Sequence, residues 1–566
     1  MPYSNPTVVT PLTSRRHFLS LLGSASYSGL AGAALTGTAL SGCGKRSAST
    51  TALTRAKDVA AVLPGYLPIE LVPPDLAGEG TIPSGYLKYP GTLVDAVREK
   101  PGQSRQPIKT MTPFWGPTPP GYGRNSFIEA VNAELGVPVH PSVQDGLSYA
   151  DKLSAVLGAR DVPDLLCAPN WEIDKIPRFG DAVRALFTDL SDYLRGDAVA
   201  AYPMLATLPT SAWKYCVWDG RLAAVPYPTN GPFPLGLFYR KDLCDRASVA
   251  VPRTIDELYF FGKRMTQPER GVWAFGALFN MVQMFFKCPG SSKGGWRRRA
   301  SGGLEFKYEL PEFRQALEFT ARMYREGLVH PDLMATRGAD AKQLFNSGKI
   351  IMYEDGIGTW RGMQSEQAKV TPGFEIQPVP IFSAVGGDPL AWQRPDPIFY
   401  TFLKKGLTEQ RTRELLRVLN WCAAPFGSQE YELASSGVEG KHFTRGRDGS
   451  PIPTELGRNE ICDQYTLLGG RYPVVVSSDD VPNYVRELLA YTRATAKYLE
   501  PDLFEGIKLQ LPGNYSKNIV LSEDKLADIL RGRRPESDLG AIVQQWRATG
   551  GDEARAYLEK ALSESS

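Results

Sequence analysis

The hydrophobic and polar positions in the first third of the chain's body repeat with two different periods. Residues 108–113 alternate as a strand does, and 137–143 and 165–167 are short apolar runs of the same kind. Between these runs, residues 126–135 and 149–157 place an apolar residue every three or four positions, which predicts helices. Strands that alternate with helices indicate an α/β fold with a largely parallel sheet.

The same two periods continue toward the end of the chain. They predict further strands at 235–239, 349–353 and 399–403, and further helices at 254–258, 311–326 and 408–423. After about residue 483 the pattern is mainly helical, and it ends in two amphipathic segments, 539–546 and 554–562.

Cap residues support two of these helices. Ser126 with Glu129, and Thr254 with Glu257, have the spacing of a capping box, in which a hydroxyl and a carboxylate satisfy the first free N–H groups. We therefore expect the helices to begin at these residues.

Aromatic and amide side chains follow two of the predicted strands. Trp115 comes directly after the first strand, and Asn170 and Trp171 follow the third. Because ligands of parallel α/β sheets bind beyond the carboxyl ends of the strands, these loops are the first places to look for a site.

Length and charge limit the possibilities. The chain has 566 residues, about twice the roughly 250–300 at which one hydrophobic core stops growing, so at least two lobes are expected. The net charge of +3 gives no global field for nucleic acid or an anionic membrane. The triplet Arg297-Arg298-Arg299 lies among Gly and Ser, and we interpret it as a solvated loop, with an anion-contacting lid as the alternative.

The first 43 residues have the features of an export signal. Arg15 and Arg16 precede Phe18 as in a twin-arginine signal, and an uncharged run follows that ends in Leu-Ser-Gly-Cys43. This ending resembles the lipobox of bacterial lipoproteins, which implies cleavage after residue 42 and a lipid on Cys43. A transmembrane anchor is the alternative, but Gly and Ser dilute the run. We expect a protein anchored on the outer face of the bacterial cytoplasmic membrane.

The other six cysteines form no Cys-x-x-Cys pair, which disfavours a zinc or redox motif. Export permits disulfides, but in a chain of this size some of these residues are expected to be buried thiols.

Five local patterns follow one another in the body and carry a family resemblance. They lie at 213–226, 237–258, 316–332, 344–352 and 427–444. In this order they resemble the family 1 extracellular solute-binding proteins, the substrate-capture subunits of carbohydrate-type ABC importers, and among them the large LipO-like lipoprotein branch.

The resemblance implies a fold of two α/β lobes, each a mixed and mostly parallel sheet flanked by helices, joined by hinge strands (the type II periplasmic-binding-protein fold). We expect the chain to cross between lobes near 225–234, 353–358 and 403–408. The expected organisation is a signal peptide at 1–42, a lipid-anchored tether and irregular lead-in at 43–106, lobe 1 at 107–229 with 356–405, and lobe 2 at 230–355 with 406–566.

The resemblance also implies a carbohydrate ligand. Aromatic rings cover the apolar C–H faces of a sugar, and carboxylates, amides and Arg bind its hydroxyls. The candidates at strand ends and crossings are Trp115, Asn170, Trp171, Tyr227, Phe233, Trp273, Glu354, Asp355, Trp360, Trp392 and Arg394. Trp171, Tyr227, Asp355 and Trp360 rank highest by residue type and position, whereas Trp213, Trp218 and Trp421 are expected to be packing residues.

Motifs for catalysis are weak in this sequence. Gly290-Ser291-Ser292-Lys293-Gly294 has the Gly-x-Ser-x-Gly form, but it lacks the strand before it and the helix after it that a nucleophile elbow needs. We find no EF-hand calcium loop, P-loop or His-Glu-x-x-His, and expect neither metal nor cofactor.

The sequence therefore favours a monomeric importer subunit that binds a carbohydrate, probably an oligosaccharide, and delivers it to ABC permease subunits. The alternatives are a secreted carbohydrate-active enzyme and a ligand sensor for a membrane kinase.

Overall fold

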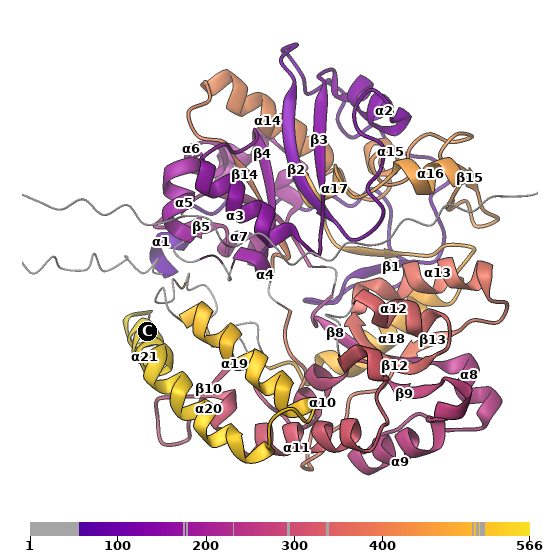
Figure 1. Cartoon of the computed structure of the whole chain (residues 1–566). Helices are drawn as coiled ribbons and strands as arrows, with labels where there is room; N and C mark the ends of the chain where they lie inside the picture. The colour runs from indigo at the N-terminus through magenta and orange to yellow at the C-terminus, as the bar shows by residue number, and fades with distance from the viewer. Residues whose placement is uncertain are drawn as a thin grey trace, which may run out of the picture. The chain divides into compact units, whose positions relative to one another are not determined.

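The two largest sheets of the described chain are each flanked by helices (Figure 1). The computed structural model describes residues 56–565, apart from 174–175, 177–178, 230, 291–294, 335–338, 395, 501–502, 505–508 and 510–514. The expected signal segment, Cys43 and Ser291 to Gly294 of the Gly-x-Ser-x-Gly motif lie outside the described residues. No helix in the described ranges is both long and apolar enough to span a membrane.

The first sheet has five strands in the order β3-β2-β4-β14-β7. Their bounds are β2 Ile108–Phe114, β3 Val139–Asp145, β4 Leu165–Pro169, β7 Ala224–Tyr227 and β14 Phe399–Leu403. Within this sheet β2 is parallel to β3 and β4, and β14 runs antiparallel to both β4 and β7. One reversed strand among strands of common direction is the mixed, mostly parallel sheet expected from the sequence.

Helices from both ends of the chain cover the first sheet. They are α2 Ser126–Leu135, α3 Tyr149–Ala159, α5 Phe179–Leu186, α7 Thr210–Lys214, α14 Glu409–Cys422 and α17 Thr466–Gly469. Their apolar residues join those of the strands in one buried cluster, which includes the fully or almost fully buried Phe127, Tyr149 and Leu415. The expected packing residues Trp213, Trp218 and Trp421 are indeed buried here.

The second sheet has four strands in the order β13-β8-β12-β9. Its elements are β8 Leu235–Arg240, β9 Trp273–Phe275, β12 Ile350–Gly356 and β13 Ile376–Pro378, with α8 Lys241–Ala247, α9 Ile255–Met265, α10 Phe279–Phe285, α11 Pro311–Arg325, α12 Ala339–Asn346, α13 Trp360–Val370 and α18 Tyr484–Ala496. Here β8 is the reversed strand, antiparallel to β12 and β13. This sheet is therefore also mixed and mostly parallel.

The chain passes between the two sheets at places that differ in part from those expected. The passage from β7 to β8 agrees with the expected crossing near 225–234. The return lies between β13 and β14 instead of near 353–358, because Trp360 and Met363 of α13 pack with Phe238 of the second sheet. A third passage follows α17, since residues 409–422 pack on the first sheet and Val475 packs with the second. Most of 356–405 therefore packs with the second sheet, and 406–469 with the first, which differs from the expected lobe boundaries.

The first helix of the body is capped differently from the prediction. Asn125, not Ser126, is the N-cap: its side-chain oxygen accepts from the N–H groups of Phe127 and Ile128. Ser126 instead donates its hydroxyl to Glu460 at 2.6 Å. For α9 the prediction holds in part, because Thr254 caps Glu257 N–H but Glu257 bonds to the N–H of Arg253.

The irregular lead-in is packed against the body over its described part. Strand β1, Ser84–Tyr86, pairs in parallel with β17, Val474–Val476. Glu430 accepts from the N–H groups of Ala96 and Val97, and Glu414 accepts from those of Gln103 and Ser104. Residues 56–106 are therefore irregular, as expected, but they are fixed to the body and are no free tether.

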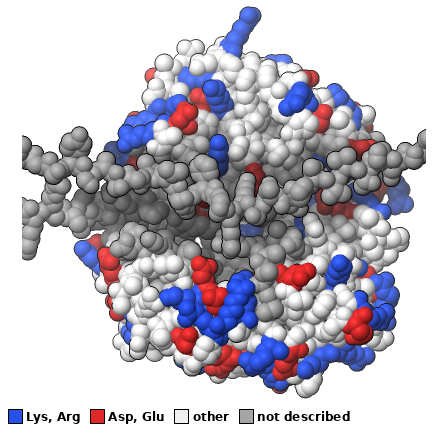
Figure 2. Space-filling model, in the orientation of Figure 1, with Lys and Arg blue, Asp and Glu red and all other residues white. Residues whose placement is uncertain are grey.

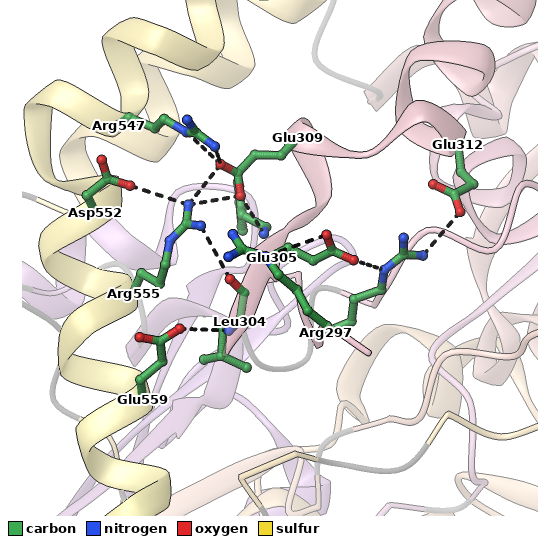
Figure 3. A network of polar contacts seen from close by, with 11 residues as sticks. Arg297, Leu304, Glu305, Glu309, Glu312, Arg547, Asp552, Arg555 and Glu559 are labelled. Carbon is green, nitrogen blue, oxygen red and sulfur yellow. Dashed lines mark hydrogen bonds and ion pairs between the residues drawn. The ribbon is translucent and has the colours of Figure 1, made fainter. Parts of the chain in front are cut away.

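The C-terminal helices α19 Tyr515–Leu530, α20 Leu539–Trp546 and α21 Asp552–Ser565 pack against the hairpin of β10 Trp296–Arg298 and β11 Leu304–Phe306. The ring of Trp546 stacks on Phe306 at 4.4 Å. Figure 3 shows the polar contacts that join this C-terminal region to the hairpin and to Glu309. Arg547 and Arg555 both bond to Glu309, Arg555 at 2.8 Å, and Glu559 accepts from Leu304 N–H at 2.7 Å.

The basic triplet belongs to this hairpin and is neutralised in part. Arg297 donates to Glu305 at 2.6 Å and to Glu312 at 3.3 Å (Figure 3), and Arg299 lies 3.8 Å from Glu305. The described face in Figure 2 likewise interleaves acidic and basic side chains. The structure therefore gives no support to an anion-contacting lid at Arg297.

All six cysteines after Cys43 are buried. Cys167, Cys244, Cys288, Cys422 and Cys462 are free thiols, and the thiol of Cys216 lies 3.6 Å from the Ala212 carbonyl oxygen. Buried thiols are thus the form that these residues take.

We predict that Arg555→Ala lowers the melting temperature much more than Arg325→Ala. The side chain of Arg555 is 13% exposed and that of its partner Glu309 is 8% exposed, so truncation leaves a nearly buried carboxylate with fewer donors, at a cost of about 1–3 kcal/mol. Arg325 pairs with Glu536 while 64% exposed, and such pairs contribute about 0–1 kcal/mol. Calorimetry measures both shifts, and equal shifts would contradict the role given to Glu309.

Candidate functional site

Aromatic residues from four strands meet at one edge of the first sheet. Trp115 follows the last residue of β2, and Trp171 lies in the short helix α4, Asn170–Ile173, directly after β4. Tyr227 is the last residue of β7. Phe399 is the first residue of β14, and because β14 runs in the opposite direction it stands at the same edge, opposite Tyr227.

The four rings are in direct contact and form what we call the aromatic cluster. Ring centroids lie 5.7 Å apart for Trp115 and Trp171, 5.5 Å for Trp171 and Phe399, and 5.7 Å for Tyr227 and Phe399. Phe399 is only 7% exposed and forms the base of the cluster, whereas Trp115 is 48% and Trp171 38% exposed. The cluster therefore offers two large apolar rings to solvent, which is typical of a binding surface.

Gly146 allows Trp115 to take this position. A Cβ atom at residue 146 would lie 2.4 Å from Cε2 of the Trp115 ring, so any larger residue would displace the ring. The loop after β3 thus packs against the ring of Trp115 at Gly146.

Polar residues beside the cluster hold the chain that returns to β14. The Asn170 side chain donates to the Pro397 carbonyl at 2.9 Å, and its own N–H donates to Ile398. Asp396 accepts from Thr229 N–H and from the Ser211 hydroxyl, both at 3.0 Å. Burial raises the pKa of Asp396 to about 6, although both hydrogen bonds act in the opposite direction.

Charged and phenolic side chains lie next to the cluster. Asp463 is exposed to solvent, yet burial raises its pKa, and Thr466 and Arg471 only partly offset this. Tyr227 and Arg394 are half-buried, and burial by surrounding protein raises the pKa of the Tyr227 hydroxyl and lowers that of Arg394 to about 10. These groups therefore keep contact with water while nearby protein atoms partly desolvate them.

Two acidic candidates from the second sheet have structural partners. Glu354 accepts from Met281 N–H at 3.0 Å and from the Asn280 side chain at 2.8 Å, so it caps the start of α10. Asp355 accepts from the Tyr353 hydroxyl at 2.6 Å and from Gly356 N–H. Both remain half-buried at the end of β12.

The other candidates pack within the second lobe. Phe233, Trp360 and Trp392 are each 2% exposed: Phe233 packs on Tyr491, Trp360 on Tyr484, and Trp392 donates to the Cys288 carbonyl. Trp273 is half-buried and packs edge-on against His330 at 4.5 Å. The structure thus brings Trp115, Trp171 and Tyr227 together, but not these four.

Phe399 is the member of the cluster that the sequence did not single out. It lies at the start of a predicted strand, and only knowledge that this strand is reversed would have placed it at the same edge as Trp115, Trp171 and Tyr227.

A Ser–His–acid contact elsewhere in the fold does not have the arrangement of a nucleophilic triad. The Nε2 atom of His442 lies 3.1 Å from the Ser126 hydroxyl and 3.2 Å from Glu460. His442 Nδ1 accepts from Val438 N–H, which puts the ring proton on Nε2, so this nitrogen donates and cannot take the proton of Ser126. The contact joins α2 to α16, Glu455–Glu460, and His442 is fully buried.

Among the described residues no group of His, Cys, Asp and Glu has the geometry to hold a metal ion.

Comparison with known proteins identifies the family. Residues 117–397 match the model described as bacterial extracellular solute-binding protein. The chain belongs to this family.

Similar proteins cover most of this solute-binding protein. The polygalacturonan/rhamnogalacturonan-binding protein YtcQ of Bacillus subtilis (strain 168) is 20% identical over 437 residues, 73% of this chain and 83% of YtcQ. The alginate-binding protein AlgQ2, crystallised without calcium ion, superposes with a TM-score of 0.59 at 15% identity and covers 83% of this chain and 100% of its own. An HMO-binding, ABC-transporter-associated protein from Bifidobacterium longum infantis gives 0.60 at 14% identity over 81% and 99%. These structures establish the two-lobed fold.

For this solute-binding protein we predict that Glu354→Gln becomes more stable relative to wild type as pH rises from about 4.5 to about 7. Burial raises the pKa of Glu354 to about 7. The negative charge of Asp355 also raises this pKa, whereas the hydrogen bonds from Met281 and Asn280 lower it. Between the unfolded value of 4.5 and 7, the native state keeps a proton that the unfolded state has lost, so this group's contribution to stability falls as pH rises. Gln cannot titrate, and its oxygen can still accept from Met281 N–H.

The expected difference, on the order of 1–3 kcal/mol, is measured by denaturant unfolding of both proteins at several pH values. A difference that stays constant from pH 4.5 to 7 would show that Glu354 titrates normally.

Proposed function

We propose that the protein captures a carbohydrate on the aromatic cluster and delivers it to the permease of an ABC importer. The observation that carries the proposal is the continuous set of four rings with Trp115 and Trp171 open to solvent at a ligand-binding edge. The ligands in the names of similar proteins support the same class, because polygalacturonan, alginate and HMO are all carbohydrates.

The chemistry of the site suits a sugar. A pyranose presents an apolar C–H face that an indole ring can cover, and its hydroxyls need donors and acceptors around the rim. Arg394, Asp396 and Asp463 supply such groups beside the rings.

The extent of the cluster favours an oligosaccharide over a single sugar. The ring centroids follow one another at 5.5–5.7 Å from Trp115 through Trp171 and Phe399 to Tyr227. More than one sugar unit can therefore contact aromatic surface at the same time.

We propose binding without catalysis. The family and its structural neighbours are binding proteins. Closure of the two lobes over the ligand would form the surface that the permease recognises, and this requires the ligand to favour the closed state.

We also propose export by the twin-arginine route and a lipid anchor on Cys43. Arg15, Arg16 and the Leu-Ser-Gly-Cys43 ending support this, together with membership of an extracellular family. In this arrangement a monomeric body is retained at the outer face of the membrane beside its permease.

Replacing Trp171 by Ala is expected to weaken glycan binding by about 1–3 kcal/mol, the usual contribution of a well-packed aromatic ring. Isothermal titration with the best ligand from a glycan panel measures the change in Kd. Phe260→Ala is the matched control, since Phe260 is 65% exposed on α9 of the second lobe. An unchanged Kd for Trp171→Ala would remove the cluster from the site, and turnover of any glycan would contradict binding without catalysis.

Replacing Cys43 by Ala is expected to move the protein from the membrane fraction to the soluble fraction of exporting cells. The thiol is the atom that would carry the lipid, and one acyl chain contributes about 0.8 kcal/mol per buried CH₂. Metabolic labelling with a radioactive fatty acid and cell fractionation measure both effects. Labelling that persists in Cys43→Ala would place the lipid elsewhere.

A further inference from the structure

Arg394 stands out among the arginines next to the aromatic cluster. Its backbone N–H donates to the Pro232 carbonyl at 2.7 Å, where the chain returning to β14 runs beside the chain leaving β7. Ile398 N–H donates in the same way to Tyr227. Arg394 is therefore fixed in the crossing segments, and the Tyr227 hydroxyl is the ionisable group that acts on its charge.

Buried arginines elsewhere in the described chain have acceptors for their guanidinium groups. Arg240 donates to both oxygens of Asp242 at 2.8 Å, and Arg411 donates to Glu414 at 2.6 Å. Arg471, which also lies near Tyr227, donates to the Cys422 carbonyl and the Ser435 hydroxyl. Within the described residues, no acceptor lies within hydrogen-bond or ion-pair distance of the Arg394 guanidinium.

The acid closest to Arg394 in sequence is already engaged. Asp396 uses one oxygen for Thr229 N–H and the other for the Ser211 hydroxyl. Asp463, an exposed acid near Tyr227, interacts electrostatically with Arg471. The cation of Arg394 is thus partly desolvated and has no counter-charge in ion-pair contact among the described residues, and burial lowers its pKa to about 10.

An unpaired, partly buried cation is unfavourable, and an anion brought by a ligand relieves the cost. The planar guanidinium fork binds a carboxylate through two parallel hydrogen bonds. A sugar that carries a carboxylate on an otherwise apolar ring matches both the fork and the rings beside it.

We propose that Arg394 binds a carboxylate of the ligand, so that the captured saccharide is an oligomer of uronic acids. This inference rests on the proposed function and defines its substrate class. The basic triplet at 297–299 is the competing anion site, but Arg297 and Arg299 already face Glu305.

The test compares matched pairs of ligands on the full chain. Oligomers of galacturonate, mannuronate and glucuronate are titrated by calorimetry, each beside its methyl ester, which keeps the ring and removes the charge. We expect at least one acid to bind the wild type about 10–100-fold more tightly than its ester, as a charged hydrogen bond provides. Arg394→Gln should abolish this preference, so that the acid and its ester bind with equal Kd values, and circular dichroism checks that the variant is folded.

Arg298→Gln is the matched control, because Arg298 is exposed on the competing hairpin. The preference should persist in it and should decline with added salt in the wild type. Esters or neutral glycans that bind as tightly as the acids, with binding still dependent on Trp171, would overturn the inference and leave the proposed function intact. If Trp171→Ala binds like the wild type, or if no saccharide binds, the proposed function fails with it.

Discussion

Strand β14 enters the first sheet between β4 and β7 and runs against both of them. This reversal places the beginning of β14 beside the ends of its neighbours, so that Phe399 meets Trp171 and Tyr227. A parallel β14 would put Phe399 at the opposite edge, and the two tryptophans would lose the ring on which they rest. The returning chain must therefore arrive at the edge that carries the aromatic cluster, and Arg394 and Asp396, which lie just before β14, are placed at the same edge.

The polar groups of this region divide into those that hold the fold and those that remain available. Asn170 and Asp396 form hydrogen bonds with the two crossing segments, and these bonds fix the geometry of the cluster. Glu354 does the same for the first turn of α10. Among the described residues beside the cluster, these contacts leave available the exposed rings of Trp115 and Trp171, the half-buried Tyr227 and the Arg394 guanidinium. Specificity in such a site depends on few groups, each of which is held by a rigid neighbour.

Local sequence patterns predicted most elements because they depend on neighbouring residues. The strands at 108–113 and 399–403 and the helix at 311–326 are close to those observed, since each has its own periodicity of apolar residues. The lobe boundaries differ from the prediction because the partner of α13 or α14 is chosen by long-range packing that no local period encodes. The same limit applies to the site. Trp115, Trp171 and Tyr227 were predicted as candidates from their positions at strand ends. Trp360 and Trp392 were chosen on the same grounds but lie in the core. The edge at which Phe399 lies depends on the direction of its strand, which no local pattern encodes.

The lead-in has a practical consequence for producing this protein. Gly85 of β1 lies so close to α18 that a Cβ atom there would be 2.5 Å from Leu489 and 2.9 Å from Val485. Cutting the chain at the start of β2 would remove β1, uncover these apolar side chains and leave β17 without its partner strand. Exposed edges of this kind pair with other chains and promote aggregation. A shortened protein for crystallisation or for a sugar biosensor should therefore begin near residue 56, although the sequence between 56 and 106 has the composition of a dispensable linker.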